Sequence, residues 1–168
     1  GKVTTPVHVV DKATKLHTLY DRIHTIDTRF EVVKRDAEVR RWQAVAQGGS
    51  TELAQAEYEA FCRQCDADRD FLRQANLGAE RMSDTDLARV QAIANRYRWR
   101  NPAGQEVPFL SDDELLNLTI RAGTLTADER QIINHHIVAT IKMLEQLSWP
   151  KHLQRVPEYA GGHHARMD

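Results

Sequence analysis

Apolar residues recur every seven positions over the first third of the chain. One row consists of Leu16, Ile23, Phe30 and Ala37, and a second row, at the same spacing, of Leu19, Ile26 and Val33. Charged residues fill the positions between them, which is the pattern of a long amphipathic helix. We therefore predict a helix over residues 16–46, ended by Gly48 and Gly49.

A second long helix is predicted over residues 51–76, where the apolar stripe is weaker. Because only the Gly-Gly turn separates the two segments, we expect an antiparallel helical hairpin. The residues expected to face one another are Leu19, Ile23, Ile26, Phe30 and Val33 on one side and Leu53, Phe61, Phe71 and Leu72 on the other. Alternatively, the same heptads could form a coiled coil between two copies of the chain. The chain would then be a homodimer through its long helices.

Cap signals predict three further helices. They are Ser83 with Asp86, Ser111 with Glu114, and Thr126 with Glu129. The last of these helices should run to about residue 147, with a core stripe made by Ile133, Ile137, Ile141 and Leu144. Residues 1–15 predict an irregular or short extended entry. The segment from residue 152 onward predicts helix or turns, interrupted by Pro157 and Gly161-Gly162.

No strand pattern is longer than residues 96–100, Arg-Tyr-Arg-Trp-Arg, so the predicted fold class is all-α. We interpret this stretch as a helix end that packs Tyr97 and Trp99 and leaves the arginines in solvent. A single-strand nucleic-acid binder also interleaves basic and aromatic residues, but five such residues in a chain of net charge −1 make that interpretation the weaker one. We therefore expect no nucleic-acid partner.

Length and composition describe an ordinary globular domain. The chain has 168 residues, enough to bury a core, and no apolar run long enough to cross a membrane. We expect no signal peptide and no disulfide framework, because charges interrupt the first residues and the only cysteines are Cys62 and Cys65. Half of a zinc site is the alternative for this pair, but we interpret it as two ordinary thiols. The predicted location is cytoplasmic.

Histidines gather near the end of the chain. Those in the last part are His135, His136, His152, His163 and His164, and histidine is the commonest neutral-pH metal ligand. Adjacent residues on a helix point about 100° apart, so His163 and His164 could reach two metals, or one metal and one substrate oxygen. The alternative for these two is a surface pair, and for His136 it is either a buried, hydrogen-bonded core histidine or a surface one.

Both ends of the chain resemble one known family, the HD-GYP domains. The start, GKVTTP followed by Val9-Val10-Asp11-Lys12, resembles the stretch after the family's His-Asp pair, which reads HD-x-GK, then Pro, an apolar pair and Lys. Residues 123–129, GTLTADE, followed by His136, resemble the family's G-x-L-T-x-x-E … H helix. Residues 156–168, from VPE to HHARMD, resemble the HHE-R-x-D segment that leads into G-x-GYP.

The resemblance implies an all-α hydrolase of cyclic di-GMP that uses divalent metal ions such as iron or manganese. By position in these motifs, His136, His163 and His164 are the implied metal ligands. Lys2 matches the lysine that contacts the substrate phosphate, Arg166 is an implied substrate-binding residue, and Asp168 belongs to the signature motif. The implied partners are a cyclic dinucleotide and GGDEF-type signalling proteins.

The chain also departs from the family. It begins at the Gly of HD-x-GK and stops at Asp168, before G-x-GYP, and Ala165 stands where the family usually has Glu. Residues 1–15 and 122–168 would form parts of the HD-GYP-like domain, and residues 16–121 a helical insertion carrying the long hairpin. We therefore expect a fragment of a phosphodiesterase, inactive as the isolated chain. The alternative is a degenerate, non-catalytic module that acts through protein contacts.

Overall fold

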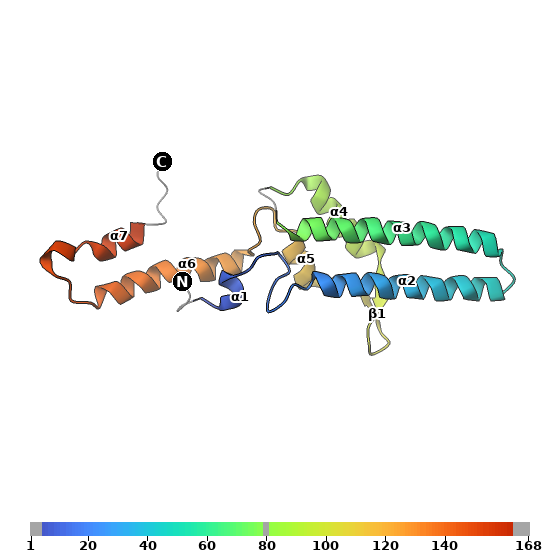
Figure 1. Cartoon of the computed structure of the whole chain (residues 1–168), viewed down its shortest axis with the longest axis horizontal. Coiled ribbons are helices and arrows are strands. Elements are labelled where there is room, and N and C mark those ends of the chain that lie inside the picture. The colour runs from blue at the N-terminus through green and yellow to red at the C-terminus, as the bar shows by residue number, and fades with distance from the viewer. Residues whose placement is uncertain (1–4, 79–80, 163–168) are drawn as a thin grey trace. The chain divides into compact units, whose positions relative to one another are not determined.

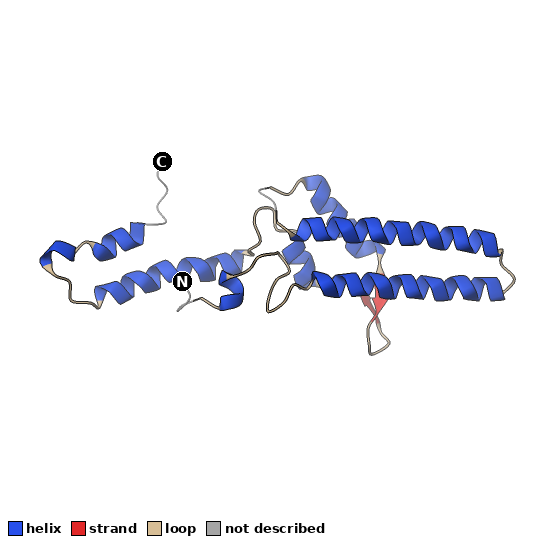
Figure 2. Cartoon of the chain, in the orientation of Figure 1, coloured by secondary structure: helices blue, strands red, loops and turns tan. Residues whose placement is uncertain are grey.

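The computed structural model describes residues 5–78 and 81–162, and it divides the chain into two compact units. Unit 1 comprises residues 1–12 and 125–168, and unit 2 comprises residues 13–124. The described part is mostly helical, with one small two-stranded sheet (Figure 2). The predicted all-α class is therefore confirmed.

Unit 2 is built on a long antiparallel helical hairpin, as predicted (Figure 1). Helix α2 spans Ile23–Ala46 and helix α3 spans Thr51–Asn76. The side chain of Ser50 accepts a hydrogen bond from the backbone N–H of Leu53 and so caps α3. Gly48, with φ of 91°, supplies the left-handed conformation that the turn between the helices requires.

The remaining elements of unit 2 pack against the hairpin. They are α4 (Asp84–Arg96), β1 (Arg98–Arg100), β2 (Glu106–Pro108) and α5 (Asp112–Leu118). The predicted caps are confirmed, because the side chain of Ser83 caps α4 and Ser111 with Glu114 forms a complete capping box at α5.

The core of unit 2 lies where these elements cover the hairpin. Phe30 of α2 packs against Tyr97 and Phe109, with ring centroids 5.5 and 4.5 Å apart. The four buried residues of α2, Ile23, Ile26, Phe30 and Val33, all belong to the predicted heptad rows, whereas Ala37 of the same rows is only half-buried. None of residues 34–64 is buried, so the half of the hairpin next to its connecting turn has no core of its own.

Two predicted features of the hairpin are wrong. Helix α2 begins at Ile23 rather than at residue 16, because the chain turns at His17–Asp21 and Asp21 accepts a hydrogen bond from the N–H of Ile23. Leu19 lies in that turn and is 90% exposed, and Leu53, next to the connecting turn, is 61% exposed. Neither leucine faces the opposite helix. Phe61 and Phe71 are only partly buried, and Leu72 is fully buried as predicted.

The alternating stretch 96–100 is a helix end only in its first two residues, and its last three residues form a strand that was not predicted. Helix α4 ends at Arg96, and β1 pairs with β2 in antiparallel register, Trp99 opposite Val107 and Arg100 opposite Glu106. The turn between the strands is fixed by Asn101, whose side-chain oxygen accepts a hydrogen bond from the N–H of Gln105. Tyr97 is buried and Trp99 is half-buried, so the expected packing of these two rings is confirmed.

The first and last residues of unit 2 both lie beside the C-terminal end of α3. The backbone N–H of Lys15 donates to the carbonyl of Asn76, and the N–H of Leu16 donates to the Asn76 side chain. At Gly78, with φ of 76°, an added Cβ would lie 2.9 Å from the side chain of Thr124. Only glycine therefore allows residues 123–124 to pass this closely.

Unit 1 consists of α1 (Val7–Val10), α6 (Ala127–Glu145), the short 3₁₀ helix η1 (Lys151–Leu153) and α7 (Val156–Gly162). A helical turn stands at α1, where an irregular or extended segment was predicted, because the Pro6 carbonyl accepts from Val9 and Val10. The predicted interruption at Pro157 is also wrong. Pro157 lies in the first turn of α7, where a missing N–H costs nothing.

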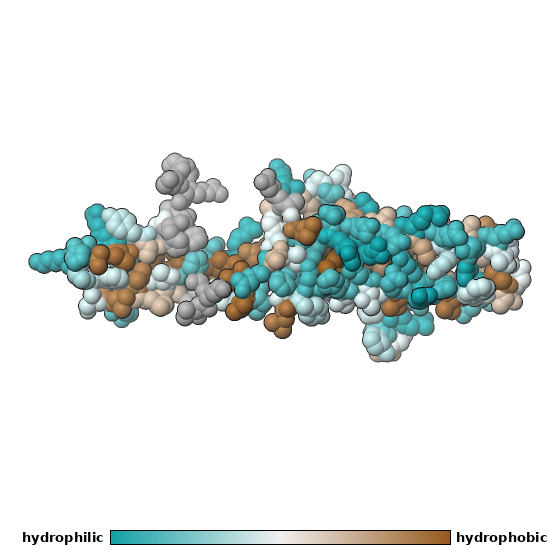
Figure 3. Space-filling view, in the orientation of Figure 1, coloured by the Kyte–Doolittle hydropathy of each residue, from teal (hydrophilic) through white to brown (hydrophobic). Residues whose placement is uncertain are grey.

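The apolar stripe predicted for α6 does not form a core within the described residues. None of its residues is buried, and Ile133, Ile137, Ile141 and Leu144 are only half-buried. Helix α6 packs against two short helices, α7 and α1, and part of its surface stays open. Figure 3 shows hydrophobic side chains on the visible surface of the chain. The large apolar and aromatic residues that are exposed in unit 1 include Ile132, Val138, Met143, Leu147 and Tyr159.

Candidate functional site

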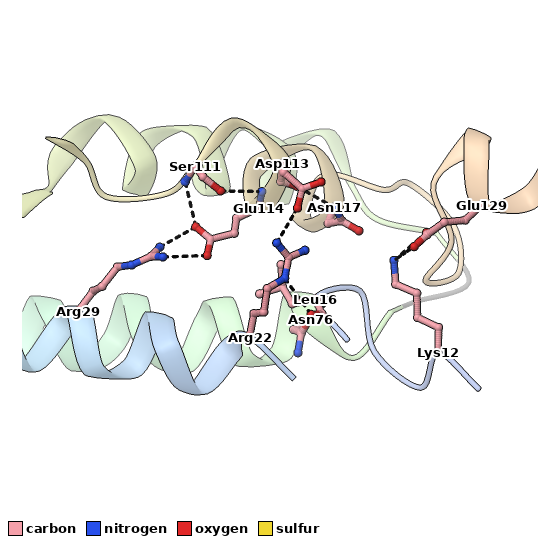
Figure 4. A network of polar contacts seen from close by, with 10 residues as sticks. All are labelled: Lys12, Leu16, Arg22, Arg29, Asn76, Ser111, Asp113, Glu114, Asn117 and Glu129. Carbon is pink, nitrogen blue, oxygen red and sulfur yellow. Dashed lines mark hydrogen bonds and ion pairs between the residues drawn. The ribbon is translucent and has the colours of Figure 1, made fainter. Parts of the chain in front are cut away.

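The two motif-bearing ends of the chain are joined in unit 1 by one ion pair. The ammonium group of Lys12, after α1, donates to both carboxylate oxygens of Glu129 on α6, at 2.9 and 2.7 Å (Figure 4). The Lys12 side chain is 1% exposed and that of Glu129 is 21% exposed, so this pair is shielded from water. Helix α1 also packs against α6. The N-terminal motif therefore lies beside the helix that carries His136.

Glu129 has a second role as the third helical residue of the α6 capping box. Its carboxylate accepts from the N–H of Thr126 at 2.8 Å, and its own N–H donates to the Thr126 hydroxyl at 3.2 Å. Burial alone would raise the pKa of Glu129, but the hydrogen bonds from Lys12 and Thr126 outweigh it and hold the pKa below its ordinary value. The T-x-x-E part of the motif, Thr126 to Glu129, is thus the capping box that determines where α6 begins.

His136 lies two helical turns after Glu129, so both side chains project from the same side of α6, about 10 Å apart along the axis. The ring is half-buried, and its Nδ1 contacts the backbone carbonyl of Ile133. Since a carbonyl only accepts, a hydrogen bond here requires the proton on Nδ1, and in that tautomer Nε2 is the nitrogen that can bind a metal. Histidines that bind metals commonly have this arrangement. His135, by contrast, is exposed.

The other predicted site residues lie outside the described residues. These are Lys2, His163, His164, Arg166 and Asp168. Within residues 5–78 and 81–162, no group of three or more His, Cys, Asp or Glu side chains gathers as a metal centre would require. Among the described residues, His136 is therefore a candidate metal ligand, but the described side chains do not form a complete metal site. The convergence of the three histidines stays a prediction.

A second shielded ion pair holds unit 2 together, and no local pattern in the sequence predicts which residues form it. The guanidinium of Arg29 on α2 donates to both carboxylate oxygens of Glu114 on α5, at 2.6 and 3.0 Å, and also to the Phe109 carbonyl (Figure 4). Burial would raise the pKa of Glu114, but the hydrogen bonds from Arg29 and Ser111 hold it below its ordinary value. The capping box predicted the position of Glu114, whereas nothing local identified Arg29.

Asp68 is a third buried charge, and it ties α3 to α4. Its carboxylate accepts from the Tyr97 hydroxyl at 2.8 Å and from Arg96 at 2.6 Å. Cys65 lies one turn before Asp68 on α3, and burial raises the pKa of its thiol to about 11. Both cysteines are free thiols, and within the described chain neither belongs to a group of three or more metal-binding side chains.

In the part of the chain that the structure describes, no helix combines the length and apolar character that crossing a membrane demands.

Comparison with known proteins identifies the family. A family model described as HD domain matches residues 69–168, more than half of the chain. The matched segment starts within α3, so it includes part of the region predicted as an insertion, and the insertion boundaries stay a prediction. Neither the curated proteins nor the solved structures include a match to the chain. HD domains are metal-dependent phosphohydrolases, and this chain belongs to the HD domain family.

Proposed function

We propose that this chain forms part of a metal-dependent phosphodiesterase that hydrolyses cyclic di-GMP. Membership of the HD domain family gives the reaction class, the metal-dependent hydrolysis of phosphate esters. The choice of substrate rests on the HD-GYP-like order of motifs in residues 1–15 and 122–168.

The observation that supports the proposal best is the Lys12–Glu129 ion pair. A site built from both motif segments requires that they lie in one compact unit, although more than a hundred residues separate them in the sequence. Unit 1 contains both segments, and the pair between Lys12 and Glu129 joins them directly. Because Glu129 and His136 share one side of α6, the N-terminal segment lies against the side of the helix that carries the candidate ligand.

Each site residue has a chemical part in this proposal. His136, His163 and His164 would hold a divalent metal, iron or manganese. Such an ion, when bound, activates a water and offsets charge on the phosphate. The ammonium of Lys2 and the guanidinium of Arg166 would pair with phosphate oxygens and orient the ester. The backbone carbonyl of Ile133 would keep the His136 ring in the tautomer that coordinates through Nε2.

The test compares two neighbouring histidines of α6 in the natural protein that contains this chain. His136→Ala should reduce bound iron or manganese and lower the hydrolysis of cyclic di-GMP by at least about a hundredfold, because a ligand is lost. His135→Ala, at the adjacent exposed position, should leave both close to wild type. Metal content is measured by elemental analysis and product formation by chromatography of the linear dinucleotide and GMP.

Two results would contradict the proposal at different levels. Metal-dependent hydrolysis of other phosphate esters, with no turnover of cyclic di-GMP, would overturn the substrate and leave the family's reaction class intact. Wild-type protein that takes up no metal and is unaffected by His136→Ala would point to a non-catalytic module acting through protein contacts.

A further inference from the structure

A surface pocket of about 300 Å³ opens on unit 2, beside the second half of α2. Four arginines line it, namely Arg40 of α2, Arg96 at the end of α4, and Arg98 and Arg100 of β1. Phe61 of α3 and Tyr97 also line it. We refer to it as the arginine pocket.

The charges of the arginine pocket are not balanced. Asp36 and Glu106 are the acidic side chains in its lining, so four positive and two negative charges leave a net charge of +2. Arg96 is bound to Asp68 at 2.6 Å, and Arg98 lies 3.7 Å from Glu106. Arg40 and Arg100 have no hydrogen-bond or ion-pair partner among the described residues. Two guanidinium groups are therefore available to an anion.

The local structure explains why these cations gather. Side chains alternate between the two faces of a strand, so Arg98 and Arg100 share one face of β1 and Trp99 lies on the other. The Trp99 ring is occupied by the guanidinium of Arg29, 5.2 Å from its centroid. Phe61 and Tyr97 pack edge to face at 6.0 Å, with the Tyr97 hydroxyl held by Asp68. The pocket thus combines a cationic rim with an aromatic wall, to which the partly exposed Phe61 contributes most of the accessible surface because Tyr97 is only 2% exposed.

We propose that the arginine pocket binds a small phosphate-bearing ligand with a planar apolar body, of the size of a nucleoside monophosphate. Guanidinium groups present paired N–H donors that match phosphate oxygens, and the aromatic wall suits a base. The volume is at the lower end of the range for ligand pockets, which fits one small molecule. A nucleic-acid strand would require a longer groove that follows its backbone.

This site is separate from the proposed catalytic function. Its residues all lie between positions 33 and 106 in unit 2, whereas His136 and the Lys12–Glu129 pair belong to unit 1. The two proposals can therefore fail independently. A chelator in the assay buffer keeps a metal-dependent site from contributing to nucleotide binding.

The test is calorimetric titration of the full chain with GMP, AMP and inorganic phosphate in the presence of EDTA. Replacing the two unpartnered arginines together, Arg40→Ala with Arg100→Ala, should weaken nucleotide binding about tenfold or more, because two charge-assisted contacts are lost. The matched control is Arg35→Ala with Arg63→Ala. It removes the same charge from exposed helix positions outside the pocket lining. The control should bind within about twofold of wild type, since distant surface charges are largely screened.

Circular dichroism should show that the pocket variant keeps its fold, since neither arginine has a described partner to lose. Three outcomes would overturn the proposal. They are no binding of either nucleotide by the wild-type chain, equal loss in the pocket and control variants, and affinity for single-stranded oligonucleotides that exceeds the affinity for mononucleotides and increases with their length. Binding of inorganic phosphate as tight as that of GMP and AMP would overturn the part assigned to the aromatic wall.

Discussion

Cys62 and Cys65 lie nearly one helical turn apart on α3, but their surroundings differ. Cys65 is fully buried, and burial raises the pKa of its thiol to about 11. Cys62 is half-buried. Because the thiolate is the reactive form, burial and a high pKa both protect Cys65.

We therefore predict selective labelling by a thiol reagent at pH 8. The folded chain should react at Cys62 and hardly at Cys65, and Cys62→Ser should abolish nearly all fast labelling. Counting reacted thiols by mass spectrometry checks this, and denaturant should expose the second thiol. Rapid labelling of Cys65 in the folded chain would contradict the packing of α3 described above.

Single residues also show where the sequence was least informative. Lys15 lies in a segment without periodicity, but its side chain is buried and its ammonium donates to the Leu118 carbonyl at 3.2 Å. Burial lowers the pKa of this lysine. Arg29 was not distinguished from other helix arginines until Glu114 was placed beside it. Contacts of this kind join residues far apart in the chain, and no local pattern encodes them.

At the scale of elements, α5 is held by one carboxylate with two roles. Glu114 completes the helix cap with Ser111 and forms the buried ion pair with Arg29. Its pKa is lower in the folded chain than in the unfolded chain. The pair therefore stabilises the fold above the unfolded pKa of about 4.5, and this contribution is lost as the pH falls through the folded value.

Replacing Glu114 by Gln should lower the free energy of unfolding by about 3 kcal/mol at pH 7, because Arg29 is left without its counter-charge. The difference from wild type should start to shrink as the pH falls below about 4.5, where the unfolded chain takes up the proton, and should vanish at the lower folded pKa, where the native carboxylate is neutral too. The control is Asp113→Asn, which breaks the exposed pair with Arg22 and should cost less than about 1 kcal/mol. Urea denaturation across this pH range measures both, and equal losses would contradict the burial argument.

Helix starts were predicted well because caps are local. The predicted range 51–76 is the observed range of α3, and the residues at Ser83, Ser111 and Thr126 cap α4, α5 and α6 as expected. The start of α2 was not predicted, because contacts between residues far apart in the sequence determine it. The heptad rows continue through Leu16 and Leu19, but Asp21 and Asn76 fix a turn there through hydrogen bonds between residues 55 positions apart.

At the scale of the whole molecule, the two units differ in how much core they contain. Within the described residues, every buried apolar side chain except Val9 lies between Leu16 and Leu118, inside unit 2. Burial of apolar surface is the main favourable term in folding. We therefore predict that residues 13–124 fold on their own, with a cooperative thermal transition by circular dichroism and dispersed amide signals by NMR. A gradual, non-cooperative loss of helix would contradict this.

The candidate site was predictable only in part. Family motifs singled out His136 and placed both ends of the chain in one domain, and the structure brings Lys12 to Glu129. Periodicity could not show that Glu129 would serve both a helix cap and an ion pair, since that depends on where α1 lies. It also could not show that Arg98 and Arg100 would share a pocket with Arg40, because this requires the β-hairpin that was not predicted.

The meeting of both ends of unit 2 at the end of α3 has a consequence for the order of folding. Lys12 and Glu129 are 117 positions apart, and closing a flexible loop of that length costs about 4 kcal/mol of chain entropy. Once unit 2 has folded, Lys15 and Thr124 are both fixed beside residues 76–78, so only short segments separate Lys12 from Glu129. Unit 2 should therefore fold first. Mutations that slow its folding would delay the pairing of Lys12 with Glu129 without touching either residue.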